Sequence, residues 1–104
     1  MSVYGRWLAA TIANGQTSSA EVNLGRDYDF LEIQIPTVTS CTLKATVAEL
    51  TGGTFRDLGE GVTTNTTTGA YSDVWKLGGY QFIKVVSSAA QGAERLIRVR
   101  GMRY

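Results

Sequence analysis

Apolar and polar side chains alternate along several runs of this chain, and this two-residue period constrains the fold more than any other feature. Residues 31–35 read Leu-Glu-Ile-Gln-Ile, which predicts a half-buried strand because successive side chains of a strand point to opposite faces. Pro36 lacks a backbone N–H and is expected to end that strand. The same alternation over residues 41–47 places Cys41 on the core side, as a buried and unreactive thiol.

Two later runs, residues 81–87 and 95–100, are rich in β-branched residues. Residues 4–12 and 20–24 are weaker strand candidates. No window of helical length carries an apolar stripe at helical spacing, and turn signals recur about every 8–12 residues. The sequence therefore predicts an all-β fold. We expect a single domain over residues 1–104, an antiparallel β-sandwich or jelly-roll-like barrel of about seven to eight short strands.

Glycine pairs mark the expected turns. Asn14-Gly15 predicts a type I′ hairpin turn that joins the strand before it to the segment that begins at Gln16. Residues 89–94 fit either a helical turn or a loop. The other expected turns are Gly52-Gly53, residues 59–61 and Gly78-Gly79.

Residues 63–69 differ in composition from the rest of the chain. They hold five Thr within six residues and no apolar anchor, which predicts a long, flexible, solvated loop. The loop is a candidate contact with a partner through Thr64, Asn65, Thr66 and Thr67.

The chain has no His and a single Cys among its 104 residues. Nucleophile systems that need His, the common His-bearing zinc and iron sites, an intrachain disulfide and a thiolate metal site are therefore excluded within one chain. We expect no catalytic residue, no metal and no cofactor, and synthesis in a reducing cytosol. No targeting segment is expected, and no apolar run approaches the ~20 residues of a membrane span, so no membrane association is predicted.

Positive charge is concentrated at the end of the chain. The net charge is +1, but the last ten residues carry +4, which leaves −3 for the first 94. One interpretation is that Arg95, Arg98, Arg100 and Arg103 dock on an acidic surface of a partner. The alternative is a solvated strand face that pairs with an acid such as Glu32 or Glu49 across the sheet. Nucleic-acid binding is not expected, because a near-neutral chain lacks the basic footprint of such proteins.

Acidic and aromatic residues offer two further hypotheses. Two of the carboxylates near turns could in principle hydrolyse a glycosidic bond, but surface carboxylates usually solvate or cap turns, so we do not expect an enzyme. Exposed aromatic rings on one sheet face could stack on sugars, whereas Phe82 and Trp75 are preferred as core residues. The carboxylates are Glu49, Asp57, Glu60 and Asp73, and the candidate sugar platform is Tyr71, Trp75 and Tyr80.

Four short segments carry a family resemblance. They are residues 11–19 (TIANGQTSS), 31–36 (LEIQIP), 53–58 (GTFRDL) and 80–88 (YQFIKVVSS). Their order is similar to that of small β-sandwich structural proteins of tailed bacteriophages. The resemblance covers most of the chain but does not include the arginine-rich ending, and it defines no catalytic residues to carry over.

The resemblance implies a virion component, foremost a decoration (cement) protein that binds the outside of the capsid and stabilises it. Its partner would be the major capsid protein or another virion protein, with self-association into dimers or trimers left open. Such a protein would be made in the bacterial cytoplasm and end on the capsid exterior. The alternative is a carbohydrate-binding or receptor-binding module of a phage tail or fibre.

Overall fold

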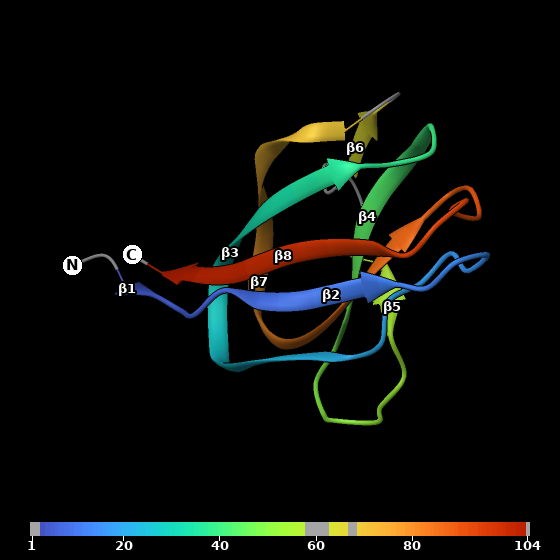
Figure 1. Ribbon diagram of the computed structural model, residues 1–104. Coiled ribbons are helices and arrows are strands. Elements are labelled where there is room, and N and C mark those ends of the chain that lie inside the picture. Colours follow the sequence, from blue (N-terminus) through green and yellow to red (C-terminus); the bar gives the residue numbers. More distant parts are fainter. Residues whose placement is uncertain (1–2, 58–62, 67–68, 104) are drawn as a thin grey trace.

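The computed structural model describes residues 3–57, 63–66 and 69–103 (Figure 1). Within these ranges all regular secondary structure is β, which confirms the predicted fold class. In chain order the strands are β1 (Val3–Tyr4), β2 (Leu8–Ile12), β3 (Val22–Thr37), β4 (Cys41–Ala48), β5 (Arg56–Asp57), β6 (Thr63–Thr66), β7 (Gly69–Ser87) and β8 (Arg95–Arg103).

One continuous antiparallel sheet folds over into two layers, because the long strands β3 and β7 belong to both (Figure 1). In one layer, β8 lies between the last part of β3 and the short edge strands β1 and β2. In the other layer, the last part of β7 pairs with β4, which carries β5 and β6 on its far side. The arrangement is a β-sandwich whose two layers are joined as in a barrel, by strands that bend from one into the other, which agrees with the predicted sandwich or barrel.

Glycines in the left-handed region lie where the long strands bend. Gly78 (φ +75°) and Gly79 (φ +90°) lie inside β7, and Gly25 (φ +90°) lies inside β3 next to a shift in the β3–β7 register. Glycine adopts these φ values without a Cβ penalty. The predicted turn at Gly78-Gly79 is therefore wrong as a strand boundary, because the strand continues through it into the second layer.

The turn at Asn14-Gly15 forms, but it does not make a hairpin. Gln16 N donates to Ala13 O at 3.0 Å and Gly15 has φ +80°, whereas Asn14 lacks the positive φ that a type I′ turn requires. β2 pairs with β8, and the segment after the turn pairs with β7 through the Ser18 bridge to Val86. The hairpin prediction is wrong because a distant strand, not the next segment, completes the sheet beside β2.

The predicted loop over residues 63–69 is also wrong for its first four residues and for Gly69, with which β7 begins. Thr63–Thr66 form β6, which pairs in register with residues 41–44 of β4. An edge strand needs no apolar anchor when backbone pairing holds it, and β-branched Thr suits the extended backbone. Residues 58–62, with the turn expected at 59–61, and residues 67–68 lie outside the described residues.

The core is built from the alternating positions that the sequence marked. Ile33, Ile97 and Val99 are fully buried, and Cys41 is buried as predicted. β3 continues to Thr37, so Pro36 lies within it and does not end it. Residues 89–94 form a loop. That loop is tied down by the buried Gln91, whose amide donates to Ser87 Oγ at 2.9 Å and whose Oε1 accepts from Thr39 N at 2.8 Å.

Candidate functional site

The four C-terminal arginines all lie on β8, but the structure gives them different surroundings. Arg98 is exposed on the outer side of the strand, opposite Gln34 of β3 and Ala9 of β2. Arg100 lies two residues further along β8 on the same side, opposite Glu32 of β3. Period-2 geometry explains why Arg98 and Arg100 share a side, since Val99 between them points into the core.

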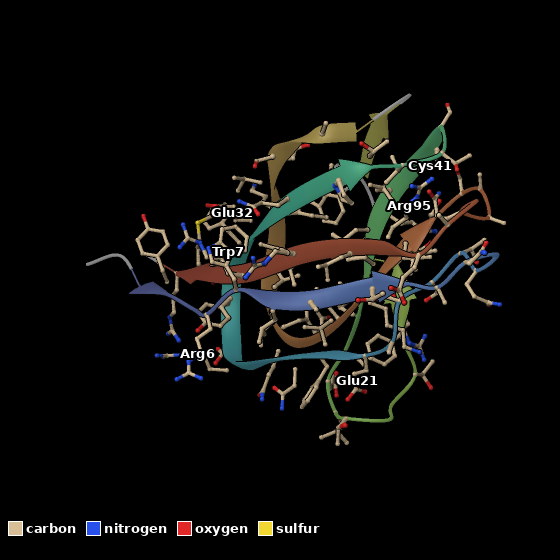
Figure 2. The ribbon with its side chains drawn as sticks, in the orientation of Figure 1. Arg6, Trp7, Glu21, Glu32, Cys41 and Arg95 are labelled. Carbon is tan, nitrogen blue, oxygen red and sulfur yellow. The ribbon has the colours of Figure 1, made fainter. Side chains whose placement is uncertain are left out.

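Arg100 is half-buried against other side chains of the chain. Its guanidinium lies 4.9 Å from the centre of the Tyr4 ring and 4.7 Å from the centre of the Trp7 ring. Its Nη2 lies 3.3 Å from both carboxylate oxygens of Glu32, and the two side chains are only 28% and 23% exposed. Figure 2 shows Trp7 and Glu32 close together beside β8. We call Tyr4, Trp7, Glu32 and Arg100 the arginine clamp, because it fixes the N-terminal segment against β8.

Arg95 and Arg103 also have partners within the chain. Arg95 Nε donates to Gln91 Oε1 and its Nη2 to Thr39 Oγ1, both at 3.3 Å. Arg103 lies 3.9 Å from Asp27 in an exposed ion pair. Among the described residues, Arg98 alone of the four has no hydrogen bond or ion pair. For Arg100, the structure confirms the second interpretation, in which the arginine pairs with an acid across the sheet, and the acid is Glu32.

The outer side of this layer mixes apolar and polar groups. Leu96 is 54% exposed on β8, on the same side as Arg98. Val74 is 52% exposed on β7, opposite Glu32 and diagonal to Gln34. A shallow hollow of about 310 Å³ runs between Leu96, Arg98 and Gln34. We call Gln34, Val74, Leu96 and Arg98 the β8 face. Such a mixture of apolar contact area with a forked cation suits protein docking better than chemistry.

The other predicted contact residues lie elsewhere. Thr64, Asn65 and Thr66 belong to β6, which β3, β7 and β4 separate from β8 in the sheet, so the structure does not join them to the β8 face. The backbone of these three residues is described but their side chains are not, and Thr67 lies outside the described residues.

The predicted sugar platform is wrong, because the ring of Trp75 is buried. Trp75 is 2% exposed and belongs to the core, because it alternates with outward-facing neighbours on β7. Tyr80 is half-buried against the core, and the side chain of Tyr71 lies outside the described part. Phe82, expected in the core, is half-buried. Without Trp75 at the surface, these rings cannot form a flat stacking surface.

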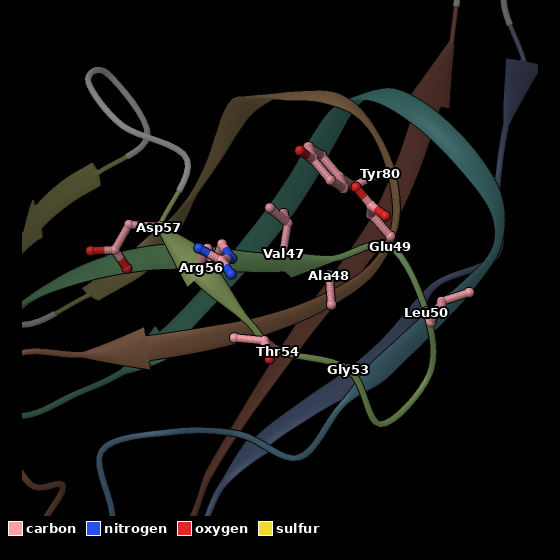
Figure 3. A pocket seen from close by; sticks show the side chains of 9 residues that line it. All are labelled: Val47, Ala48, Glu49, Leu50, Gly53, Thr54, Arg56, Asp57 and Tyr80. Atoms are coloured by element: carbon pink, nitrogen blue, oxygen red, sulfur yellow. The ribbon is translucent and has the colours of Figure 1, made fainter.

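The candidate carboxylates are brought together only in part. Glu49 and Asp57 line one groove of about 430 Å³, together with Arg56 and Tyr80 (Figure 3). Both carboxylates are exposed, and Asp57 lies 3.0 Å from Lys44 Nζ in an ion pair. Asp73 lies on the first part of β7, opposite Ile33, and Glu60 is outside the described residues. The groove carries charges of both signs, which suits a weak polar contact.

Glu21 has a structural role that the sequence did not reveal. It accepts hydrogen bonds from Thr51 Oγ1 at 2.5 Å and from Gly52 N at 2.7 Å. The Thr51 bond, then the Gly52 bond and the charge of Lys84 lower the pKa of Glu21 below its ordinary value. The carboxylate thus ties the segment before β3 to the turn after β4.

The sequence also did not predict a second cationic region. Arg6 and Arg26 line a groove near the start of β1, although 19 residues separate them in the sequence. The only local signal was Gly25, which marks the bend in β3 that presents Arg26.

No group of three or more Cys, Asp or Glu side chains in ranges 3–57, 63–66 and 69–103 lies close enough to hold a metal ion. The same ranges contain no helix with the length and apolarity of a membrane span.

Comparison with known proteins gives a fold but no family. No family model matches the chain, and no curated protein matches its sequence. The crystal structure of the SPBc2 prophage-derived protein YomS shares the fold, with a TM-score of 0.63 and 12% identity over 98% of this chain and 95% of that one.

Two weaker structural matches do not establish a shared fold, because their TM-scores are below 0.5. A chain of the cyanophage Pam1 capsid asymmetric unit gives 0.40 at 15% identity, over 98% of this chain and 81% of that chain. The module CsCBM6-3 from Clostridium stercorarium, in complex with cellobiose, gives 0.34 at 16% identity, over 95% and 72% of the two chains.

Proposed function

We propose that this chain is a non-enzymatic structural protein of a tailed-phage particle, and that it decorates the outer surface of the major capsid lattice. The observation that carries the proposal is the match of fold along nearly the whole of both chains with YomS, a prophage-derived protein. The short segments that resemble phage β-sandwich proteins support the same role.

The β8 face supplies a docking surface for that role. Leu96 and Val74 offer apolar area that association would bury, and Arg98 offers an uncompensated charge for an acidic side chain of the capsid protein. The molecule measures 38 × 27 × 25 Å, so one side of it can accommodate the ~800 Å² per partner of a standard interface. Binding to the assembled shell but not to its dissociated subunits would stabilise the shell by linkage.

Co-sedimentation with expanded capsids that lack this protein tests the proposal. The purified chain should bind in a fixed ratio and raise the temperature at which the capsids disrupt. Arg98→Glu should weaken binding, while Arg56→Glu, an exposed arginine on β5, serves as the matched control with unchanged binding. Failure to co-sediment at both low and moderate salt would refute decoration. Arg100→Glu is unsuitable as a docking probe, because it breaks the arginine clamp.

A further inference from the structure

A groove of about 410 Å³ lies at the end of the molecule where β1 pairs with the last residues of β8. Its walls come from two segments: one runs from the end of β1 to the start of β2, residues 4–8, and the other is residues 23–28 at the bend of β3. Arg6 lies on the first wall and Arg26 on the second. Figure 2 shows Arg6 at this end of the molecule.

The two arginines are free within the described structure. Both are exposed, and neither forms an ion pair or hydrogen bond with another residue in the described ranges. No carboxylate lines the groove. This contrasts with Arg100 and Arg103, which face acids of the same chain. Among the described residues, the groove therefore holds two positive charges with no carboxylate in its lining and no ion pair to either arginine.

The backbone that carries Arg26 is held in place by a side chain. Gly25 adopts φ +90° and donates its N–H to Asn23 Oδ1 at 2.8 Å. The same oxygen accepts from Gln81 Nε2 at 2.9 Å. Arg26 thus follows a bend that the Asn23 side chain holds in place, which reduces the backbone ordering that a ligand must otherwise impose.

The wall that carries Arg6 is fixed by close packing. Gly5 N donates to Gly101 O at 2.8 Å. The buried ring of Tyr28 lies so close to Gly5 and Gly101 that a methyl group on either would overlap it. Tyr28 and the half-buried Leu8 also line the groove and give it an apolar floor.

We propose that this groove binds an acidic, extended segment of a partner protein, with its carboxylates on Arg6 and Arg26 and an apolar side chain against Leu8 and Tyr28. Guanidinium groups give forked, charge-assisted hydrogen bonds to carboxylates. The inference does not rest on the proposed capsid role, because it concerns a different surface from the β8 face and holds for any partner with such a segment.

A protein carboxylate fits this groove better than a nucleic-acid backbone. Nucleic-acid sites follow a run of phosphates with many cations, and here two arginines stand alone on a chain of net charge +1. Asp27, which pairs with Arg103, and Asp29 are exposed on β3 beyond Arg26, outside the groove lining, and would repel a phosphate chain that continued past it. A short segment with two or three carboxylates avoids that repulsion.

The test measures binding of the intact chain to labelled eight-residue peptides by fluorescence anisotropy. The probe peptide contains Glu and Ser around one central Leu, and its matched control replaces every Glu by Gln. The Glu peptide should bind at least about tenfold more tightly than the Gln peptide, with affinity that falls as salt rises. Arg6→Ala and Arg26→Ala should each weaken binding about five- to tenfold, since a charged hydrogen bond is lost.

Two controls separate this groove from the other cationic surfaces. Arg98→Ala on the β8 face and Arg56→Ala on β5 should bind the Glu peptide as the wild type does. The double variant Arg6→Glu with Arg26→Glu should lose the Glu peptide and bind a Lys counterpart. All four arginines are exposed, so circular dichroism should show unchanged folding in every variant.

Three results would overturn the proposal. The first is equal affinity for the Glu and Gln peptides. The second is unchanged binding after both Arg6→Ala and Arg26→Ala. The third is tighter binding of a labelled octathymidylate than of the Glu peptide with the same dependence on Arg6 and Arg26, which would assign the groove to nucleic acid.

Discussion

Replacement of Arg100 by Ala should destabilise the fold far more than replacement of Arg98, its neighbour on the same side of β8. Arg100 faces two aromatic rings at 4.7 and 4.9 Å, and each such contact contributes about 0.5–1 kcal/mol. Its ion pair with Glu32 is about a quarter exposed. Solvent screening reduces that pair to about 1 kcal/mol. The expected loss is about 2–3 kcal/mol in the free energy of unfolding.

Urea denaturation followed by tryptophan fluorescence measures this loss. For a domain of this size it corresponds to a fall in Tm of roughly 10–20 °C. Arg98→Ala is the matched control and should change the free energy of unfolding by less than about 0.5 kcal/mol. Arg100→Lys should recover part of the loss, because it keeps the charge but not the planar fork. If Arg100→Ala costs no more than Arg98→Ala, the arginine clamp does not hold the N-terminal segment and the reasoning is refuted.

Two further predictions concern packing and pH. Gly101→Ala should cost about 3 kcal/mol in thermal or urea unfolding, because the added methyl overlaps the Tyr28 ring; an unchanged Tm would contradict that contact. Since the folded state lowers the pKa of Glu21 below its ordinary 4.5, its contribution to stability is present above about pH 4.5 and is lost as pH falls through the lowered value. Wild type should therefore lose more stability than Glu21→Gln between pH 6 and pH 3, and equal losses would rule out this role of the Thr51 and Gly52 bonds.

Inward and outward positions along a strand could be predicted from the sequence because alternation is local. Ile97 and Val99 lie in the core and Arg98 points outward, as the period of two requires. The partner of Arg100 could not be fixed in this way. Glu32 and Glu49 were both acceptable acids by composition, and only the β3–β8 register, which places Glu32 opposite Arg100, selects one of them.

The corrections share one physical cause. Gly78-Gly79 has the composition of a turn, yet the same positive φ values bend a strand between two layers. Asn14-Gly15 makes a turn, but β2 finds its partner in β8. Trp75 was a candidate for both surface and core, and its place on β7 makes it a core residue. In each case local chemistry allowed two structures, and pairing with a strand far along the chain selected between them.

By itself, the sequence determined the all-β class, the core-facing positions of its clearly alternating runs, the buried state of Cys41 and the exclusion of chemistry that needs His or paired thiols, since these follow from residue identity and from a period of two. Only the tertiary structure decided which arginines are free. Three of the four C-terminal arginines have partners within the chain, whereas Arg6 and Arg26, 20 positions apart in the sequence, line one groove that no acid lines. Whether a surface charge is available to a partner depends on the side chains across from it, and strand register and bends set those neighbours.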